Sequence, residues 1–501
     1  MLTPEKDLYI ASVNGKDLGL AAPLGNRHGL VAGATGTGKT VTLQTMAENF
    51  SALGTPVFLT DVKGDLAGLS QPGQPAGGLV ARLDELRLRD RGYTNQAYPV
   101  CFWDILGRQG HPLRSTVSSM GPLLFSRLLD LNEVQSGVLH LVFRIADDQG
   151  LLLLDFKDLR SLVTYVGEKS GEFRLTYGNV TPASIGAIQR GLLRLEEEGG
   201  ELFFGEPSLH LADLLLNDLS GRGVINILSA ENLMNKPRLY SALLLWLLSE
   251  LFEQLPEVGD PERPRLVLMF DEAHLIFSGA PVVLREKMAQ VVRLIRSKGV
   301  GVYFITQNPV DVPGEVLAQL GHKVQHALRA FTPQEQKAVR AVAQSFRGNP
   351  AFRTEEVITN LATGEALVSF LDRQGRPGMV EKALILPPES RVGVISEEER
   401  RTILRSSRLA GRYDTVIDRE SAYEILQARF LQGQQEAKAG LEAKEDAKRA
   451  KQAASEKPGL GRTLAGDVSK QVTRTLTTTI GREIGKTIIR GVLGGILGGR
   501  R

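Results

Sequence analysis

The sequence contains a single cysteine, Cys101, among its 501 residues. One thiol excludes an internal disulfide and any metal site built from several cysteines. No uninterrupted apolar run reaches the roughly eighteen residues that a membrane-spanning helix requires. Residues 1–7 also lack the apolar region of a secretory signal. These absences favour a cytoplasmic protein.

An excess of charge of one sign is also missing, because the formal net charge is only +3. The chain as a whole therefore does not attract nucleic acid, and any path for DNA must come from local clusters of basic residues. Hydrophobic residues make up 42% of the chain, which supports a sizeable core. The length allows two or three domains, or one large domain with insertions.

The most informative segment that is present is a glycine-rich loop, GATGTGKT, at residues 33–40. It matches the pattern G-x-x-x-x-G-K-[ST], follows a short apolar run and opens into a helical pattern at residues 41–50. Such a loop turns backbone N–H groups toward an anion, and the helix N-terminus adds positive charge. Lys39 would contact the outer phosphates of ATP and the Thr40 hydroxyl would bind Mg²⁺. The alternative is a glycine-rich structural turn.

The loop residues that we predict to bind the nucleotide are Gly33, Ala34, Thr35, Gly36, Thr37, Gly38, Lys39, Thr40 and Val41.

A second motif supplies the residues for hydrolysis. Residues 265–270 have the apolar pattern of a buried parallel strand, and two carboxylates, Asp271 and Glu272, follow directly. Asp271 would hold Mg²⁺, directly or through water. Glu272 would act as the general base on the attacking water. The alternative is a strand that ends in a solvated acidic turn. The letters DEAH at residues 271–274 also occur in another helicase superfamily, whose remaining motifs are not evident here.

Two further strand ends carry polar side chains. The apolar strand at residues 301–306 ends in Gln307, whose amide could contact the γ-phosphate or the attacking water, or could belong to an ordinary turn before Pro309. The strand at residues 55–60 ends near Asp61 and Asp65. Ligands of an α/β sheet lie beyond the carboxyl ends of its strands. Asp61 or Asp65 could therefore assist the metal or the water, and a plain turn is an equal alternative.

The chain is predicted to be an α/β protein with a mostly parallel sheet and helices on both faces. Residues 1–104 and 221–395 would form the ATPase core, beginning with a hairpin before residue 28. Residues 105–220 read as a mainly helical insertion, with one helix expected at 123–146. Residues 396–457 read as a charged helical arm.

Residues 458–501 read as a glycine-spaced, amphipathic, basic tail. Apolar residues recur there every four positions from Leu476 to Ile496, among several arginines and lysines. Such a helix could pack against a partner helix or lie on an acidic membrane surface. The alternative is a tail that packs on its own domain.

Four segments together resemble the HerA-like branch of the HerA/FtsK superfamily of P-loop ATPases. They are the loop at 33–40, DEAH at 271–274, RLIRSKG at 293–299 and ITQNP at 305–309. The segments GEP at 205–207, GRGVINIL at 221–228 and VQHALRAFTP at 324–333 are similar to a bacterial subgroup of this branch. The resemblance covers roughly residues 8 to 388.

The resemblance implies a RecA-like core, a homo-oligomer in the form of a hexameric ring, and ATP-driven movement of double-stranded DNA. It implies that an arginine before the sensor strand serves the nucleotide, and Arg296 matches best, with Arg293 as the alternative. It also implies an arginine that reaches into the neighbouring subunit's site, for which we take Arg329. The family's amino-terminal β-barrel is not matched, because fewer than about thirty residues precede the first core strand.

Three functions remain open at this point. The first is a double-stranded DNA translocase, with Arg285, Lys287, Arg347 and Arg353 as candidate pore residues. The second is a protein-secreting ATPase that docks on a membrane surface through the basic tail. The third is a nucleotide-gated scaffold that recruits a nuclease or another effector protein.

Overall fold

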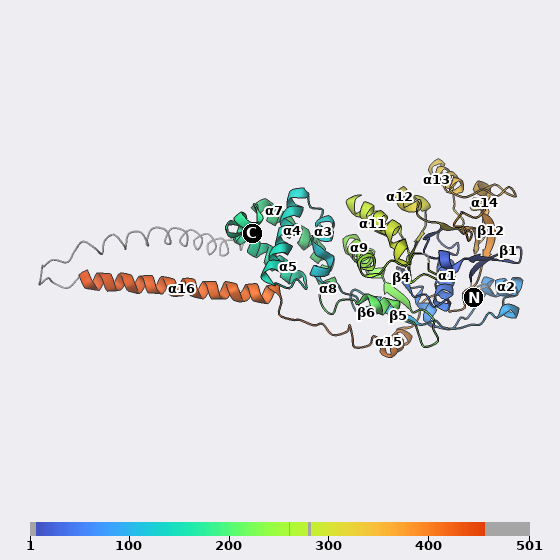
Figure 1. Cartoon of the computed structure of the whole chain (residues 1–501). Coiled ribbons are helices and arrows are strands. Elements are labelled where there is room, and N and C mark those ends of the chain that lie inside the picture. Colours follow the sequence, from blue (N-terminus) through green and yellow to red (C-terminus); the bar gives the residue numbers. More distant parts are fainter. Residues whose placement is uncertain (1–6, 260, 279–281, 456–501) are drawn as a thin grey trace. The chain divides into compact units, whose positions relative to one another are not determined.

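The computed structural model describes residues 7–259, 261–278 and 282–455 (Figure 1). The chain divides into two compact units, Met1–Arg429 and Phe430–Arg501. The predicted tail at 458–501 lies outside the described residues. Among those residues, no helix combines the length and the apolarity that a bilayer crossing requires.

One mixed sheet carries the first unit, and its spatial order is β2-β1-β12-β11-β10-β3-β9-β8-β4-β7-β5-β6. The strands are β1 Leu8–Val13, β2 Lys16–Leu20, β3 Gly29–Ala32, β4 Val57–Asp61, β5 Val100–Asp104, β6 His111–Pro112, β7 Ile225–Ser229, β8 Leu266–Phe270, β9 Val300–Thr306, β10 His322–Gln325, β11 Glu365–Ser369 and β12 Glu381–Ile385. From β10 to β6 neighbouring strands are parallel, and β11, β12, β1 and β2 extend the sheet with antiparallel pairs. The mostly parallel sheet confirms the predicted fold class.

Helices cover both faces of this sheet, as the alternation of buried side chains requires. On β8, Leu268 packs in the core that also contains α9 Pro237–Gln254 and α11 Val282–Ile295. Its neighbour Met269 packs in the opposite core, with residues of α1 Lys39–Ala52. Both faces of the strand are therefore buried, which explains its uniformly apolar sequence.

Residues between β6 and β7 form a layer of helices, whose division differs from the expected one. The helices are α3 Val117–Leu128, α4 Glu133–Gln149, α5 Phe156–Glu168, α6 Ser170–Tyr177, α7 Pro182–Glu197 and α8 Gly200–Phe203. The stretch 123–146 is not one helix, because Asn132 caps α4 and exchanges hydrogen bonds with Gln135. The apolar side chains of this layer continue the core of the α9 face without a break.

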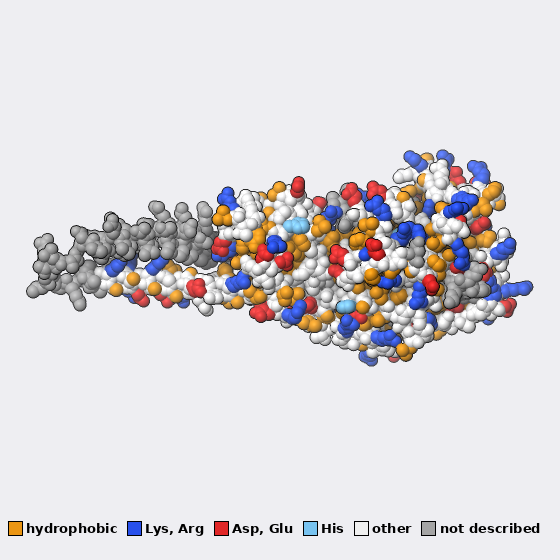
Figure 2. All heavy atoms as spheres, in the orientation of Figure 1, with side chains coloured by type: hydrophobic (Ala, Val, Ile, Leu, Met, Phe, Trp, Pro, Cys, Tyr) orange, Lys and Arg blue, Asp and Glu red, His pale blue; other side chains and the backbone are white. Residues whose placement is uncertain are grey.

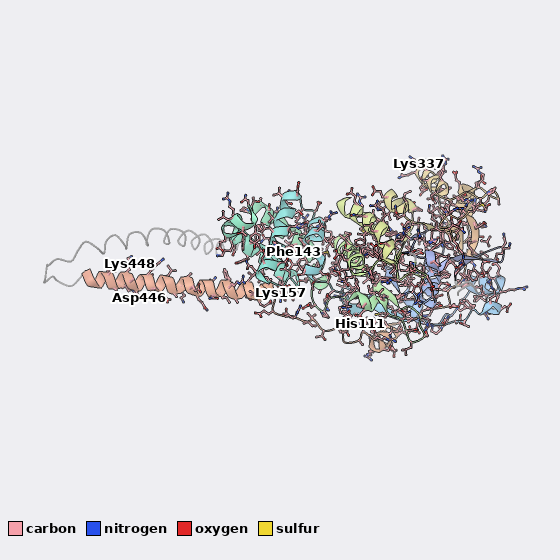
Figure 3. All side chains as sticks on the ribbon, viewed as in Figure 1. His111, Phe143, Lys157, Lys337, Asp446 and Lys448 are labelled. Carbon is pink, nitrogen blue, oxygen red and sulfur yellow. The ribbon has the colours of Figure 1, made fainter. Side chains whose placement is uncertain are left out.

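The segment 407–421, after α15 Glu397–Ser406, is fastened to the sheet and to the helical layer. Asp414 accepts a hydrogen bond from His111 Nδ1 at 3.0 Å, and Asp418 pairs with Lys157 at 2.9 Å; Figure 3 labels both partners. Asp213 bonds to Arg412 and to the Tyr413 hydroxyl. The first compact unit accordingly continues through this segment to Arg429.

The remaining helices are α2 Gly78–Glu85, α10 His274–Ser278, α12 Gly314–Leu317, α13 Pro333–Gln344, α14 Thr354–Asn360 and α16 Ala422–Ser455.

Candidate functional site

The glycine-rich loop connects the carboxyl end of β3 to the start of α1, in the strand–loop–helix context that the motif requires. Gly33, Gly36 and Gly38 have φ angles of 154°, 77° and 113°, in the region that favours glycine. A Cβ on Gly33 would lie 2.5 Å from the Cβ of His326. The loop therefore keeps its shape only with glycine at position 33.

Lys39 opens α1 with its ammonium turned back into the loop. Nζ donates hydrogen bonds to the carbonyls of Gly33 at 2.7 Å and Ala34 at 3.0 Å. Burial lowers the pKa of Lys39, while the negative charges of Glu272 and Asp271 act in the opposite direction. The structure thus brings the phosphate loop and the acidic pair, which are far apart in the sequence, into one electrostatic cluster.

Glu272 lies at the centre of this cluster, with its side chain only 4% exposed. Lys63 Nζ donates to its Oε1 at 2.6 Å and Gln307 Nε2 donates to the same oxygen at 3.2 Å. His274 Nδ1 lies 3.3 Å from Oε2. Burial would raise the pKa of Glu272, but the bonds from Lys63 and Gln307 outweigh it and lower that pKa. Gln307, predicted as the sensor, therefore contacts the predicted base.

The backbone at Glu272 has a φ of 46°, in the left-handed region that a glutamate rarely adopts. Unusual backbone conformations of this kind are concentrated at functional sites, where they orient a side chain. Here the turn directs the carboxylate toward Lys63 and Gln307.

The backbone of Asp271 is held in place by buried hydroxyl groups. Its amide donates to Thr60 Oγ1 at 3.0 Å, and the Tyr240 hydroxyl donates to the same Oγ1 at 3.2 Å. Burial, together with the adjacent Glu272 charge, raises the pKa of Asp271 to about 7. A cation bound beside Asp271 would favour the charged form of its carboxylate.

Oxygen atoms suited to Mg²⁺ lie in the same cluster as Asp271. The Thr40 hydroxyl donates to Asp65 Oδ2 at 3.3 Å, and the Asp65 charge acts on Asp271. Hydroxyl and carboxylate oxygens are the donors that Mg²⁺ prefers, alongside the phosphates of a nucleotide. The residues present therefore fit the predicted metal: Thr40 and Asp271 would hold it, with Asp65 beside Thr40.

The turn after β4 joins the two halves of the cluster. Asp61 accepts hydrogen bonds from the amides of Lys63, Gly64 and Leu66 at 3.2, 2.7 and 3.1 Å, and burial raises the pKa of Asp61 to about 6. Asp61 thus builds the turn, whereas Asp65 reaches Thr40. Lys63 was missed at the sequence level, although a lysine between two acids at a strand end was a visible signal.

His326 braces the phosphate loop from the side of β10. Its Nε2 lies 2.8 Å from Thr42 Oγ1 on α1, and its Nδ1 lies 3.0 Å from the Glu365 carbonyl. Its amide donates to the Ala32 carbonyl at 2.7 Å. Burial lowers the pKa of His326 to about 4, so the ring is neutral at pH 7. Sequence reasoning gave this residue no role.

A second brace is Arg82 on α2. Its Nη1 donates to the Gly364 carbonyl at 2.9 Å, and the Gly364 amide donates to the Thr37 carbonyl of the loop at 3.0 Å. The loop is therefore held by residues from three separate parts of the chain.

Arg296 is not brought to the phosphate loop of its own chain. It begins a short 3₁₀ helix, Arg296–Lys298, directly before the amino end of β9. With Arg27, His28 and Arg293 it lines a cavity of about 350 Å³. The strands β3 and β9 are parallel, and the phosphate loop follows the carboxyl end of β3. The cavity therefore lies at the edge formed by the amino ends of the strands, and the loop lies at the edge formed by their carboxyl ends.

Arg329 follows the carboxyl end of β10, at the same edge of the sheet as the phosphate loop, and is exposed. The sequence placed it on a strand, but β10 ends at Gln325. The chain leaves the sheet there because its next residues contact the phosphate loop, where the Ala34 amide donates to the Ala327 carbonyl at 2.8 Å.

Two of the candidate pore residues, Arg347 and Arg353, are exposed on the small lobe of α13 and α14. Figure 2 shows Lys and Arg side chains gathered over this lobe, and Figure 3 labels Lys337 on α13. Arg285 is half-buried on α11, and the Lys287 side chain lies outside the described residues.

The sequence profile of the family described as helicase HerA-like C-terminal matches residues 6–501. A comparison with curated proteins returned no match.

Among solved structures, the unbound bacterial conjugative coupling protein TrwBdeltaN70 is 18% identical with a TM-score of 0.50, covering 76% of this chain and 89% of that chain. TrwB in complex with ADP and Mg²⁺ has 18% identity and a TM-score of 0.50, covering 78% and 91%. VirB4 of Thermoanaerobacter pseudethanolicus has 15% identity and a TM-score of 0.49, covering 79% and 99%. At this identity the TrwB likeness concerns the fold, and it confirms the predicted RecA-like P-loop ATPase architecture.

Proposed function

Since the chain belongs to the helicase HerA-like C-terminal family, we propose that this ATPase works as a homo-oligomeric ring that moves double-stranded DNA. The observation that carries the proposal is the single cluster formed by the phosphate loop, Asp271, Glu272 and Gln307. Nucleotide and magnesium are supported by the TrwB structures, which include complexes with a non-hydrolysable ATP analogue and with ADP and Mg²⁺.

Each residue of the cluster has a defined task in this proposal. The loop amides from Gly33 to Val41 and the Lys39 ammonium hold the triphosphate. Thr40 and Asp271 would hold Mg²⁺, which would supply positive charge for the phosphate oxygens. Water attacks the γ-phosphorus while Glu272 accepts its proton, and ADP leaves. Gln307, already bonded to Glu272, orients the water.

The positions of Arg296 and Arg329 support a ring and suggest a different role for each arginine. Arg296 lies across the sheet from its own phosphate loop, so it can serve a nucleotide only in another chain. Arg329 is exposed and follows Ala327, whose carbonyl accepts a hydrogen bond from the Ala34 amide of its own loop. We therefore assign the contact between subunits to Arg296 and place Arg329 beside its own chain's nucleotide, the reverse of the expectation from sequence.

The basic lobe of α13 and α14 is the surface that we assign to DNA (Figure 2). Arg347 and Arg353 project from the loop between the two helices and are exposed. Contacts of this kind neutralise phosphates and release counterions, so binding is independent of sequence and weakens with salt.

The test is ATP hydrolysis with and without double-stranded DNA at two salt concentrations. We expect DNA to stimulate turnover severalfold, and the stimulation to fade between about 50 and 200 mM salt. Arg353→Ala should reduce the stimulation. Arg144→Ala is the matched control, because both arginines are exposed and each pairs with a nearby carboxylate. Arg144 pairs with Asp148 on α4, and Arg353 pairs with Glu356 on α14.

An unchanged rate with every form of DNA would reject the translocase. It would favour the alternatives with the same ATP site and another cargo, a secreted protein or a recruited nuclease or other effector. The predicted membrane contact of the tail remains a hypothesis, because residues 458–501 are outside the described residues.

A further inference from the structure

The proposed base, Glu272, is already bound to a cation that the mechanism above does not use. Lys63 Nζ lies 2.6 Å from Glu272 Oε1, the shortest contact that the carboxylate makes. The lysine side chain is 45% exposed, whereas that of Glu272 is 4% exposed. A buried carboxylate thus depends on a partner that has room to move.

Strand order explains why these two residues meet. β4 and β8 are adjacent and parallel, with Thr60 opposite Phe270, so the turns that follow them lie side by side. Asp61 fixes its turn through three backbone hydrogen bonds. The same turn carries Asp65, which accepts the hydrogen bond of Thr40. One rigid turn therefore touches the phosphate loop with one side chain and the base with another.

The ion pair has a consequence for hydrolysis. A carboxylate oxygen that accepts a hydrogen bond from an ammonium is a weaker proton acceptor, and a lone pair needed by the attacking water is occupied. Lys63 and Lys39 lie close enough for their charges to repel. A triphosphate bound at Lys39 brings new negative charge beside Lys63, which then has two competing anionic partners.

We propose that Lys63 is a positioning residue that couples ATP binding to the base: it holds Glu272 before the nucleotide arrives and shifts to the terminal phosphate when ATP binds. Gln307 then keeps Glu272 oriented through its own hydrogen bond to Oε1, and the position that Lys63 held on this oxygen becomes available to the attacking water. The bonds made and broken in hydrolysis are unchanged, since Lys63 only exchanges hydrogen-bond acceptors. This inference rests on the proposed function of the site.

The first test compares kcat and KM for Lys63→Met, Lys63→Arg and the parent. We expect Lys63→Met to lower kcat by about 10²-fold, the scale of a misplaced catalytic group, with a smaller change in KM. Lys63→Arg keeps a donor cation and should restore much of the rate. Lys169→Met is the matched control, since Lys169 is 49% exposed and pairs with Glu172 at 2.7 Å on the helical layer. A parent-like kcat in Lys63→Met would overturn the inference.

The second test separates a shift to the phosphate from a static ion pair. In the Glu272→Gln background, which holds ATP without turnover, Lys63→Met should weaken binding of radiolabelled ATP severalfold and leave ADP binding unchanged. Equal effects on ATP and ADP would overturn the shift. Rapid turnover by Glu272→Gln alone would instead reject the proposed site, so the two failures are distinguishable.

Discussion

Three histidines, His28, His322 and His326, are buried beside the strand that carries the phosphate loop. His28 Nδ1 accepts a hydrogen bond from the Val302 amide at 3.0 Å, and His322 Nε2 lies 2.8 Å from the Leu24 carbonyl. Burial lowers the pKa of His28 to about 3 and the pKa values of His322 and His326 to about 4. All three are therefore neutral in the folded protein near pH 7, and folding excludes their charged form.

The three histidines contribute a loss of stability in mild acid, which the raised pKa values of the buried Asp61 and Asp271 oppose. The unfolded chain binds protons from about pH 6.5 downward, while the folded chain binds them only near pH 4. The stabilisation is thus complete above pH 6.5 and is lost as the pH falls toward 4. Between pH 7.5 and 5.5 each histidine should remove about 1 kcal/mol from the free energy of unfolding.

The measurement is the thermal unfolding midpoint at those two pH values. The change in the midpoint from pH 7.5 to pH 5.5 should be less negative in His326→Gln than in the parent, because one of the three histidines no longer titrates. His140→Gln on α4, where the side chain is exposed, is the control and should behave as the parent does. The same change in His326→Gln and in the parent would show that His326 makes no contribution to it.

At the scale of elements, local patterns predict the strands and the residues at their ends, but not the order of the strands. The sequence predicted site roles for Lys39, Asp271, Glu272 and Gln307, since each lies at a strand end or in a glycine-rich loop with a recognisable pattern, and the structure brings the four together. It did not identify Lys63, whose contact with Glu272 exists only because β4 lies next to β8. Adjacency of this kind is set by long-range packing and has no local signal.

The predicted ends of one helix and one strand were wrong for a related reason. The helix expected at 123–146 is interrupted where Asn132 and Gln135 form a capping box, a signal present in the sequence but outweighed by the continuous apolar pattern. Arg329 lies beyond the end of β10, because the chain turns there to contact the phosphate loop through Ala327. Both differences come from polar hydrogen bonds that override hydrophobic periodicity.

At the scale of the whole molecule, the ring proposal predicts that mixed subunits complement one another. Arg296→Ala and Glu272→Gln should each abolish most turnover when assembled alone. A ring assembled from an equal mixture should regain activity at about a quarter of its sites, where an intact Glu272 meets an intact Arg296 from the next chain. The measurement is ATP turnover after the two proteins are mixed before assembly. A mixture no more active than the separate variants would contradict a shared site.

The proposed ATPase needs Glu272 as the base of an ATP site built around Lys39. The most direct measurement is the steady-state rate of ATP hydrolysis, with Mg²⁺ and saturating ATP, by the parent and by Glu272→Gln. We predict that the variant still binds ATP but turns it over about 10²- to 10⁴-fold more slowly, the loss expected when a general base is removed. Equal turnover by the two proteins would contradict the account.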